Sequence, residues 1–328
     1  MLYHFTMKIF SLILLLACAA AAQAQELIPY TDGRKWGYAA PGGKVLIRPA
    51  FSSAEPFSGG LALVRTGALY GFIDKNGAKA GAGRYTEAES FSEGCAPVRL
   101  RSMWGCVDKD GKALVPFEYE ALLPFNDGAA PAKKDGHWGM LSKATGEFNG
   151  SIFDEIYPVS EGAARTRLNG RYGYVDVSGR EILPPVYAEA SSFSGGFAAA
   201  RLGEKYGFIE RRTLGFKDKP FLLIGPYSDG LAHAQSLAAE GRCGYIDAEG
   251  KEVVPFQFAM CAPFTEGLAP VLKTLNGGWG YIGKDGKEVI DFKYSQAGSF
   301  KNGIARVAVK DDVFYIDRAG FEYKSAKK

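Results

Sequence analysis

An aromatic residue followed by glycine recurs along this chain at a spacing of 34 residues that is kept without a slip over the first six copies. The glycines are Gly37, Gly71, Gly105, Gly139, Gly173, Gly207, Gly244 and Gly280, and a ninth, degenerate copy has Phe314 in the glycine position. Tandem copies at such a period indicate a repeat fold, in which each unit buries its apolar surface against its neighbours.

Each unit contains three short runs of the β type. Examples are "GLAPVLK" (267–273), "WGYI" (279–282) and "EVIDF" (288–292), and a further segment with spaced aromatics, such as "FSSAEPF" (51–57), leads into the next unit. Short runs of this kind, separated by turn residues every 8 to 12 positions, are typical of all-β proteins. The sequence therefore predicts an all-β fold of tandem repeats.

Turn residues separate the runs in two ways. Asn169-Gly170 and Asp135-Gly136 lie between a first and a second run, and such dipeptides favour tight two-residue hairpins. The second and third runs are separated by Asp-x-x-Gly, in which the aspartate accepts hydrogen bonds from the turn and the glycine takes the left-handed conformation.

A hairpin centred on Asn169-Gly170 fixes which side chains of the first two runs face each other. One face is small and aliphatic, pairs Ala62 with Ile73 and is expected to face the core. The other face pairs a basic with an aromatic residue in five successive units: Arg65 with Tyr70, Arg99 with Trp104, Lys133 with Trp138, Arg167 with Tyr172, and Arg201 with Tyr206. We call these ten residues the basic-aromatic column. Directly opposed side chains on a sheet are close enough to interact.

Two arrangements of the units are open. One is an open superhelical array of three-stranded units, and the other is a closed β-propeller. Nine units exceed the usual four to eight blades, and propeller blades normally have four strands, so we favour the open array.

The first 24 residues are predicted to be a secretory signal peptide, with Met7 as the start. Lys8 precedes an apolar run that ends in an A-x-A cleavage pattern at Ala24, and the repeat array then occupies residues 25–328. Alternatively, "LLAC" loosely resembles a lipoprotein cleavage box and would leave a lipid anchor on Cys18. Either reading predicts an exported protein in the periplasm, the cell envelope or the outside of a bacterium.

Composition excludes several classes of protein. The formal net charge is only +3, which gives no indication of nucleic-acid binding, and no later apolar run is long enough to span a membrane. Four cysteines follow the signal segment, namely Cys95, Cys106, Cys243 and Cys261. They allow three disulfide pairings, or they simply fill small apolar positions. The hairpin register places Cys95 diagonal to Cys106, about 7 Å apart at Cβ, so we do not expect this pair to bond unless a bulge intervenes.

The pattern resembles the WG-repeat family, also called KWG repeats, of bacterial β-repeat proteins. The resemblance extends from about Leu27 to Tyr323 and depends on the Trp-Gly and Tyr-Gly pairs, the Asp-x-x-Gly turns, and "FSEG" (91–94), "FTEG" (264–267) and "FKNG" (300–303). The sixth unit departs from it, because "ERRTLG" (210–215) lacks the regular turn glycine. The resemblance implies a β-rich interaction module and supplies no catalytic residues.

We therefore expect an exported binding or scaffold module, without cofactor or metal, for a protein or an anionic polysaccharide. The basic-aromatic column is the candidate binding surface. A structural envelope protein without a ligand site is the alternative. An envelope hydrolase is less favoured, because only His137 and His233 follow the signal segment among the histidines and no catalytic motif is present.

Overall fold

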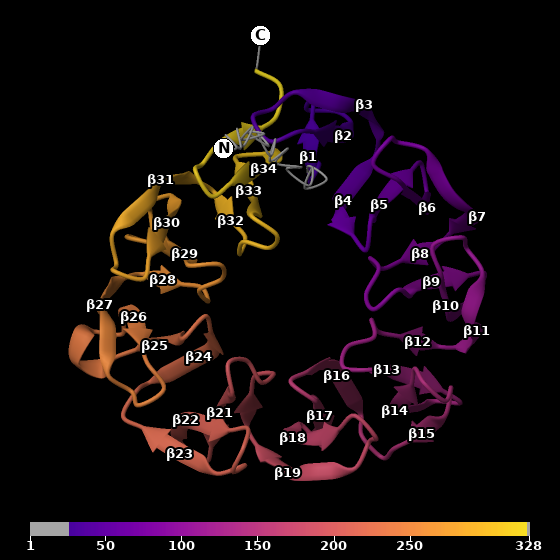
Figure 1. Cartoon of the computed structure of the whole chain (residues 1–328). Coiled ribbons are helices and arrows are strands. Elements are labelled where there is room, and N and C mark those ends of the chain that lie inside the picture. Colours follow the sequence, from indigo (N-terminus) through magenta and orange to yellow (C-terminus); the bar gives the residue numbers. More distant parts are fainter. Residues whose placement is uncertain (1–25, 327–328) are drawn as a thin grey trace, which may run out of the picture.

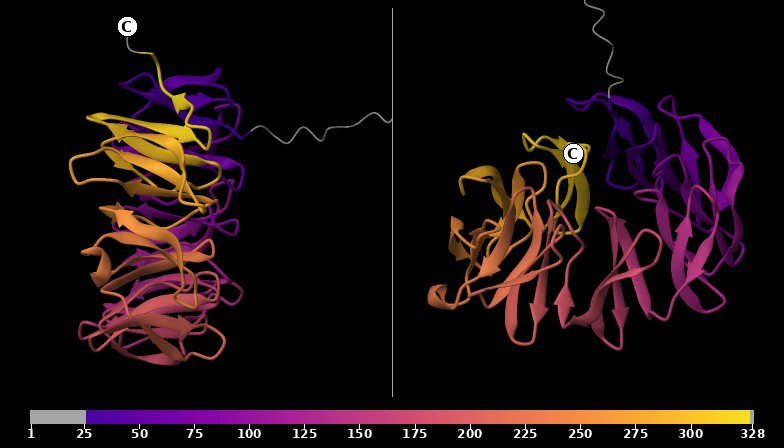
Figure 2. Two further views of the ribbon diagram at one scale, coloured as in Figure 1. Left: turned by 90° about the vertical axis from the view of Figure 1, so that its left-hand side faces the viewer. Right: turned by 60° about the horizontal axis from the view of Figure 1, so that its bottom comes forward.

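The computed structural model describes residues 26–326, and the predicted signal segment with Cys18 lies outside this range. Nine small antiparallel sheets, or blades, follow one another in sequence order around a central channel (Figure 1). Further views show that they form a ring (Figure 2). The prediction of an all-β tandem-repeat fold is confirmed, with one short 3-10 turn, η1 (Leu237–Ala239), among the described residues.

The first blade is β1 (Ile28–Thr31), β2 (Trp36–Ala39) and β3 (Val45–Phe51). The second is β4 (Ser53–Ser58), β5 (Leu61–Thr66), β6 (Leu69–Ile73) and β7 (Lys79–Tyr85). The third is β8 (Glu87–Ala88), β9 (Ala96–Leu100), β10 (Met103–Val107) and β11 (Ala113–Tyr119). The fourth is β12 (Ala121–Leu122), β13 (Ala129–Lys134), β14 (His137–Ser142) and β15 (Phe148–Gly150). The fifth is β16 (Glu155–Ser160), β17 (Ala163–Leu168), β18 (Arg171–Asp176) and β19 (Glu181–Tyr187).

The sixth blade is β20 (Glu189–Ala190), β21 (Phe197–Leu202), β22 (Lys205–Glu210) and β23 (Phe216–Lys219). The seventh is β24 (Leu223–Ser228), β25 (Leu231–Gln235), β26 (Cys243–Ile246) and β27 (Glu252–Phe258). The eighth is β28 (Met260–Cys261), β29 (Leu268–Leu272), β30 (Trp279–Gly283) and β31 (Glu288–Tyr294). The ninth is β32 (Gln296–Ala297), β33 (Ile304–Val309), β34 (Asp312–Asp317) and β35 (Glu322–Tyr323).

The ring closes where the first blade meets the ninth. Thr31 of β1 bridges Lys324, and its carbonyl accepts a hydrogen bond of 2.9 Å from the Ser325 N–H. Ile28, Ala39, Ile304, Tyr315 and Tyr323 form a buried cluster at this junction. Of the two arrangements left open by the sequence, the structure therefore adopts the closed propeller, and our preference for the open array is corrected. Closure buries the two terminal faces that an open array would leave exposed to solvent.

Eight of the nine blades contain four strands, whereas the sequence predicted three. The additional strand is the innermost one, on the channel side of each blade, and it comes from the segment with spaced aromatics (Figure 1). It is as short as two residues in β8, so its alternation is too brief to identify from sequence.

The repeated glycine lies where the outermost strand bulges across the third strand. A Cβ atom on Gly173 would lie 2.6 Å from the carbonyl oxygen of Leu183, so only glycine fits. In the ninth blade the outermost strand is reduced to Glu322–Tyr323, and Phe314 occupies the glycine position fully buried.

The predicted turns are present. Asn169 and Gly170 have φ angles of 51° and 75°, as a two-residue hairpin of this type requires. Asp74 accepts hydrogen bonds through its Oδ1 from the N–H groups of Asn76 and Ala78, at 2.9 and 2.8 Å. In the irregular sixth unit, Leu214 takes the left-handed conformation with φ 56°.

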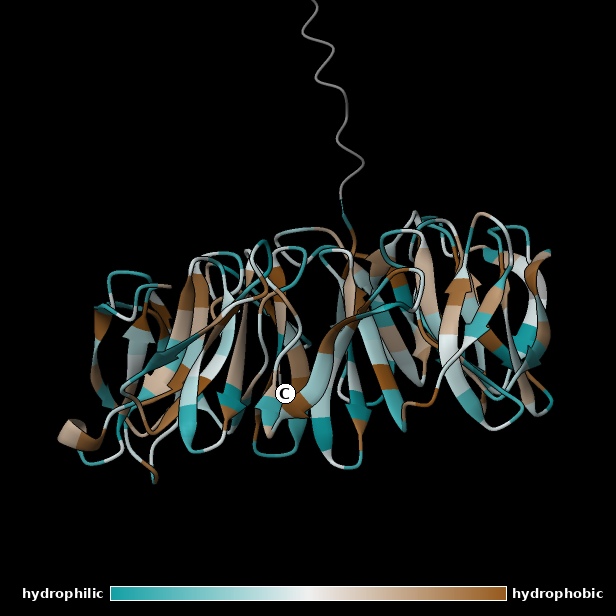
Figure 3. Cartoon of the chain, turned by 90° about the horizontal axis from the view of Figure 1, so that it is seen from below, coloured by the Kyte–Doolittle hydropathy of each residue, from teal (hydrophilic) through white to brown (hydrophobic). Residues whose placement is uncertain are grey.

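Each blade has a neighbour on both faces, so both faces pack into the core. In Figure 3 the turns at both rims are mainly hydrophilic, and the hydrophobic residues lie in the strands between them. Hydrogen bonds also join successive blades: Ser58 Oγ donates to the Phe91 carbonyl at 2.6 Å, and the Gly162 N–H donates to Asp127 Oδ2 at 2.9 Å. The acidic residue of motifs such as "FSEG" is thus a contact to the next blade.

Two disulfides are formed. Cys243 in the seventh blade bonds Cys261 in the eighth, with Cα atoms 6.1 Å apart. Cys95 bonds Cys106 within the third blade, with Cα atoms 5.8 Å apart, which corrects our expectation that this pair would not bond. Cys95 lies just before β9 and makes only an isolated bridge to Ser92, so it is not held at the spacing of a regular ladder.

Candidate functional site

The basic-aromatic column has the register predicted for it. Arg65 faces Tyr70, Arg99 faces Trp104, Lys133 faces Trp138, Arg167 faces Tyr172, and Arg201 faces Tyr206. The pairs join the second and third strands of five successive blades, next to the turn between those strands, so all of them lie toward the same face of the ring.

Only two of these cations lie over the ring of their own partner. Arg65 is 5.5 Å and Arg201 is 5.7 Å from the ring centroids of Tyr70 and Tyr206. Over Tyr172 it is Arg165, two residues before the predicted Arg167, that lies 5.0 Å from the ring centroid.

Carboxylates lie beside four of the five cations. Arg99 pairs with Glu87, Lys133 with Glu120, Arg167 with Glu155, and Arg201 with Glu189. Glu87, Glu155 and Glu189 belong to the innermost strands, so sequence reasoning missed these partners together with the strand that carries them. The column is therefore largely compensated in charge, and it is not a stripe of five free positive charges.

The aromatic residues of the column also belong to the core. Tyr70, Trp104 and Trp138 are half-buried and pack against the buried clusters between blades. The next blade therefore partly covers the aromatic face of the hairpin, and the column remains a predicted binding surface.

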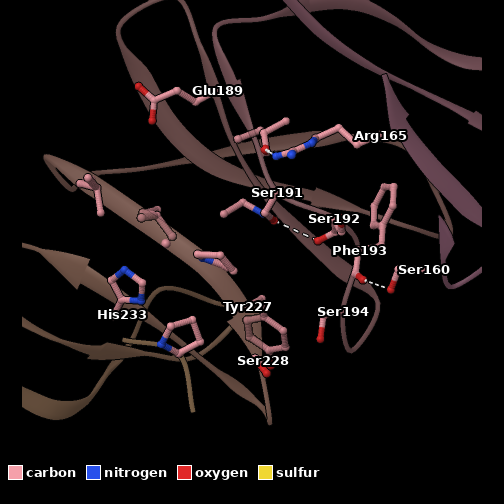
Figure 4. A pocket seen from close by; sticks show the side chains of 18 of the residues that line it. Ser160, Arg165, Glu189, Ser191, Ser192, Phe193, Ser194, Tyr227, Ser228 and His233 are labelled. Atoms are coloured by element: carbon pink, nitrogen blue, oxygen red, sulfur yellow. Dashed lines mark hydrogen bonds between the residues drawn. The ribbon is translucent and has the colours of Figure 1, made fainter. Parts of the chain in front are cut away.

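The largest cavity lies on the channel wall of the fifth to eighth blades and has a volume of about 690 Å³ (Figure 4). Its lining includes Glu189 and Tyr206 of the sixth blade, of which Tyr206 belongs to the basic-aromatic column. In the seventh blade it includes Tyr227 and His233. The guanidinium of Arg165 reaches into the same wall and donates a hydrogen bond from Nη1 to the Ala190 carbonyl.

His233 fills the space that Gly225 leaves on the neighbouring strand. A Cβ atom at Gly225 would overlap the imidazole ring, so glycine is required there. His233 Nδ1 is buried without a hydrogen-bond partner among the described residues, as is Arg165 Nε. Burial lowers the pKa of His233 to about 4, so the imidazole is neutral at pH 7.

A second hollow of about 430 Å³ begins on the other side of Tyr206, between the sixth and seventh blades. Phe221, Leu222 and Leu237 contribute to its lining, and Leu222 and Leu237 are 46% and 75% exposed. Leu237 lies in η1, within one of the two longer turns of the seventh and eighth units. We call the surface formed by Tyr206, Leu222 and Leu237 the apolar groove. Sequence reasoning missed that the turn containing Leu237 would lie against Tyr206.

Among residues 26–326, no group of three or more His, Cys, Asp or Glu side chains is arranged to hold a metal ion. The expectation that the protein uses no cofactor and is not an enzyme remains a prediction. No helix in the described part of the chain has the length and hydrophobicity needed to cross a bilayer.

Solved structures of low sequence identity are similar to this chain. The crystal structure of "the eukaryotic initiation factor" is 12% identical and aligns with a TM-score of 0.58 over 91% of this chain and 95% of that chain. Citrobacter koseri AztD is 14% identical over 92% of this chain and 93% of that chain, with a TM-score of 0.39. Identities this low show the fold alone. No curated protein matches the sequence.

The sequence profile of the WG containing repeat matches seven segments, at residues 36–70, 70–102, 104–138, 151–172, 172–206, 244–274 and 279–311. These segments cover more than half of the chain. Most of the irregular sixth unit, from Gly207 to Cys243, lies outside them. The chain therefore belongs to the WG-repeat family.

Proposed function

We propose that this protein is an exported, non-catalytic binding or scaffold ring that holds a protein partner at the face of its sixth and seventh blades. One observation supports the proposal most directly. Tyr206 lines both the channel-wall cavity and the apolar groove, where Leu222 and Leu237 are exposed beside it. Exposed apolar side chains next to a hollow are typical of protein interaction sites.

An anionic polysaccharide along the basic-aromatic column is the weaker choice. Such a ligand needs free cations, and carboxylates already lie beside four of the five. An apolar groove at the end of the column favours a protein over a charged sugar chain. We retain the column as the surface that flanks the proposed contact.

Export follows from the predicted signal segment, and we place the protein in the bacterial periplasm, the cell envelope or the exterior. Intact-mass measurement of the protein from cells distinguishes the two predicted mature forms. A chain beginning at Gln25 supports cleavage after Ala24, and a lipid-modified chain beginning at Cys18 supports an anchor.

A photo-crosslinking amino acid in place of Leu237 tests the proposed binding site in cells. We expect an adduct with another protein, and we expect it to be lost when Leu222→Asp is added. The matched control places the same cross-linker at Leu114, which is 51% exposed on the outermost strand of the third blade. Adducts of equal yield at both positions, or none at Leu237, contradict the proposed site. Adducts only between copies of this chain support a structural role instead.

A further inference from the structure

The first blade is the only described blade without an innermost strand. In the other eight, a strand on the channel side pairs with the second strand of the blade, whereas the first blade consists of β1, β2 and β3 alone. β1 is thus an edge strand that faces the channel (Figure 1). Among residues 26–326, the chain after β35 reaches this edge only at one end, where Ser325 bonds Thr31. Exposed edges of this kind bind added strands.

The junction between the fifth and sixth blades shows how an innermost strand is held. Two side chains of the fifth blade donate to consecutive carbonyls of the sixth: Arg165 to Ala190, and the Tyr174 hydroxyl to Ser191 at 2.7 Å. The Ser191 N–H in turn donates to the Ala199 carbonyl at 2.8 Å, within its own blade. One short stretch of backbone therefore bonds to two blades at once.

The junction between the ninth and first blades has the same three hydrogen-bonding groups: an arginine, a tyrosine hydroxyl and a backbone carbonyl. Arg306 faces Tyr315 across the ninth blade as Arg165 faces Tyr174 across the fifth. Pro29 of the first blade occupies the position of Ala199, opposite the residue that follows the repeated glycine. Its carbonyl and the Tyr315 hydroxyl have no hydrogen-bond partner among the described residues, because none of the described strands lies where it would bond both.

A cavity of about 490 Å³ lies on the channel side of this junction. Its lining includes Ile304, Arg306 and Tyr315 of the ninth blade, and Glu55 and Phe57 of the second. We call an innermost strand together with the few residues that directly follow it an inner-strand segment. Among the described residues, the buried cluster at this junction is the only one of the nine without a residue of such a segment. The other eight each contain one: Phe57, Phe91, Phe125, Val159, Phe193, Tyr227, Phe264 or Phe300.

Tyr315 packs edge-on against Trp36 of the first blade, with ring centroids 5.8 Å apart, but no described ring lies beside it in the position that the next blade fills for its counterparts. Tyr174 lies 4.7 Å from Phe193 between ring centroids, and Tyr281 lies 5.0 Å from Phe300. Such pairs stabilise a contact beyond the burial of their area. An added strand would therefore gain an aromatic contact as well as hydrogen bonds.

The eight innermost strands define the peptide that fits. Together with the residues that directly follow the shorter ones, they read AEPF, AESF, LLPF, IYPV, ASSF, IGPY, CAPF and AGSF. The shared pattern is an apolar or small residue, any residue, proline or serine, and an aromatic residue or valine. The residues of this chain that stand one repeat before AEPF are 20–23, and they read AAAQ, with glutamine at the ring position. This stretch does not match the pattern of the inner-strand segments, which favours a segment from a partner protein.

Charge supports an acidic residue at the second position of the pattern. Lys301 and Arg306 face the cavity from the ninth blade, and Glu55 and Glu89 line it from the other side, where the two cations act on the carboxyl of Glu55. No carboxylate of the described residues lies within ion-pair distance of Lys301 or Arg306. The innermost strands of the second and third blades carry Glu55 and Glu89 at this position.

We propose that an extended segment of a partner protein, with the pattern apolar, acidic, proline or serine, aromatic, adds to β1 as the fourth strand of the first blade. The Tyr315 hydroxyl and Arg306 donate to its consecutive carbonyls, and its N–H bonds Pro29. This inference deepens the proposed function by naming the partner's segment and a second place where it is held.

A capped, fluorescent peptide with the sequence of residues 86–92, TEAESFS, tests the proposal by fluorescence anisotropy with the mature, exported chain. We expect saturable binding. Methylating the backbone nitrogen of the peptide's second glutamate removes the donor to Pro29 and should weaken binding about fivefold, as the loss of one hydrogen bond predicts. Replacing the peptide's phenylalanine by alanine should weaken binding about tenfold.

Tyr315→Phe in the protein should weaken binding of the same peptide about fivefold. Phenylalanine is compatible with the fold there, because Phe72 and Phe208 occupy the corresponding position in two other blades. The matched control is Tyr281→Phe, whose hydroxyl bonds the Gly298 carbonyl at a filled junction. This control should lower the melting temperature without changing peptide affinity.

Three results would overturn the inference: no saturable binding, equal binding of the methylated peptide, or equal effects of Tyr315→Phe and Tyr281→Phe on affinity. If the mature chain begins at Cys18, binding that appears only after residues 19–24 are removed would assign the position to this chain instead. If the peptide fails while cross-linking at Leu237 persists, the inference is wrong and the proposed function stands.

Discussion

The hydroxyl of Tyr174 in the fifth blade donates a hydrogen bond of 2.7 Å to the carbonyl of Ser191 on the innermost strand of the sixth. Tyr38, Tyr245 and Tyr281 make the same bond to the blades that follow theirs. The tyrosine after the repeated glycine therefore connects each of these blades to the next. Its hydroxyl bonds a backbone carbonyl that the next blade does not satisfy by itself.

Replacing Tyr174 by phenylalanine should lower the free energy of unfolding by about 1 to 2 kcal/mol, because the buried Ser191 carbonyl loses a partner. Chemical denaturation measures the change. Tyr187→Phe is the matched control, since Tyr187 is equally buried and its hydroxyl makes no hydrogen bond to a described residue. Equal losses in the two variants would show that the bond between blades contributes nothing.

Replacing Gly173 by alanine should destabilise the protein by about 1 to 3 kcal/mol through overpacking, because the added Cβ would lie 2.6 Å from a backbone oxygen that cannot move by itself. Valine should cost more. Gly71→Ala is the control at the same repeat position, since its nearest contact would be an ordinary 3.7 Å. Thermal unfolding of both variants measures the difference, and similar melting temperatures would contradict a close-packed role for Gly173.

Acid should destabilise the fold through His233. Its pKa is about 4 in the folded state and near 6.5 when unfolded, so the unfolded state binds more protons between these values. Stability should fall as the pH drops from 6.5 to 4, by at most about 3 kcal/mol, with no contribution from this residue above 6.5. Unfolding of the parent and of His233→Leu across this range isolates the effect, because leucine occupies the corresponding position at Leu63. Parallel pH profiles would contradict the prediction.

Changing Arg99, Lys133 and Arg167 together to glutamine tests the basic-aromatic column. Their ion pairs are exposed, and such pairs contribute about 0.2 to 1 kcal/mol each, so the loss of stability should be small. If the column binds an anionic partner, capture of an acidic polysaccharide should weaken and become less sensitive to salt. If the triple variant binds as before and melts well below the parent, the column is structural.

The sequence by itself determined the interactions that lie within one unit. The pairing of Arg65 with Tyr70, the hairpin at Asn169-Gly170 and the turn closed by Asp74 depend on residues a few positions apart, and the repeat displays each pattern many times. Eight copies of one glycine, with Phe314 at the ninth position, also indicated the number of repeat units. Local geometry fixes all of these, because turn type sets hairpin register.

Only the tertiary structure decided the interactions between residues of different units. The innermost strand is too short to show a periodicity, and it is held by the neighbouring blade through groups such as Arg165 and Tyr174. The carboxylates that compensate the column come with that strand, and closure depends on contacts between residues such as Thr31 and Lys324 at opposite ends of the chain. These partners lie in different blades, so a pattern within one repeat cannot show them. The vacant edge of β1 is visible only once the ring is closed, because it is defined by what the ninth blade presents to the first.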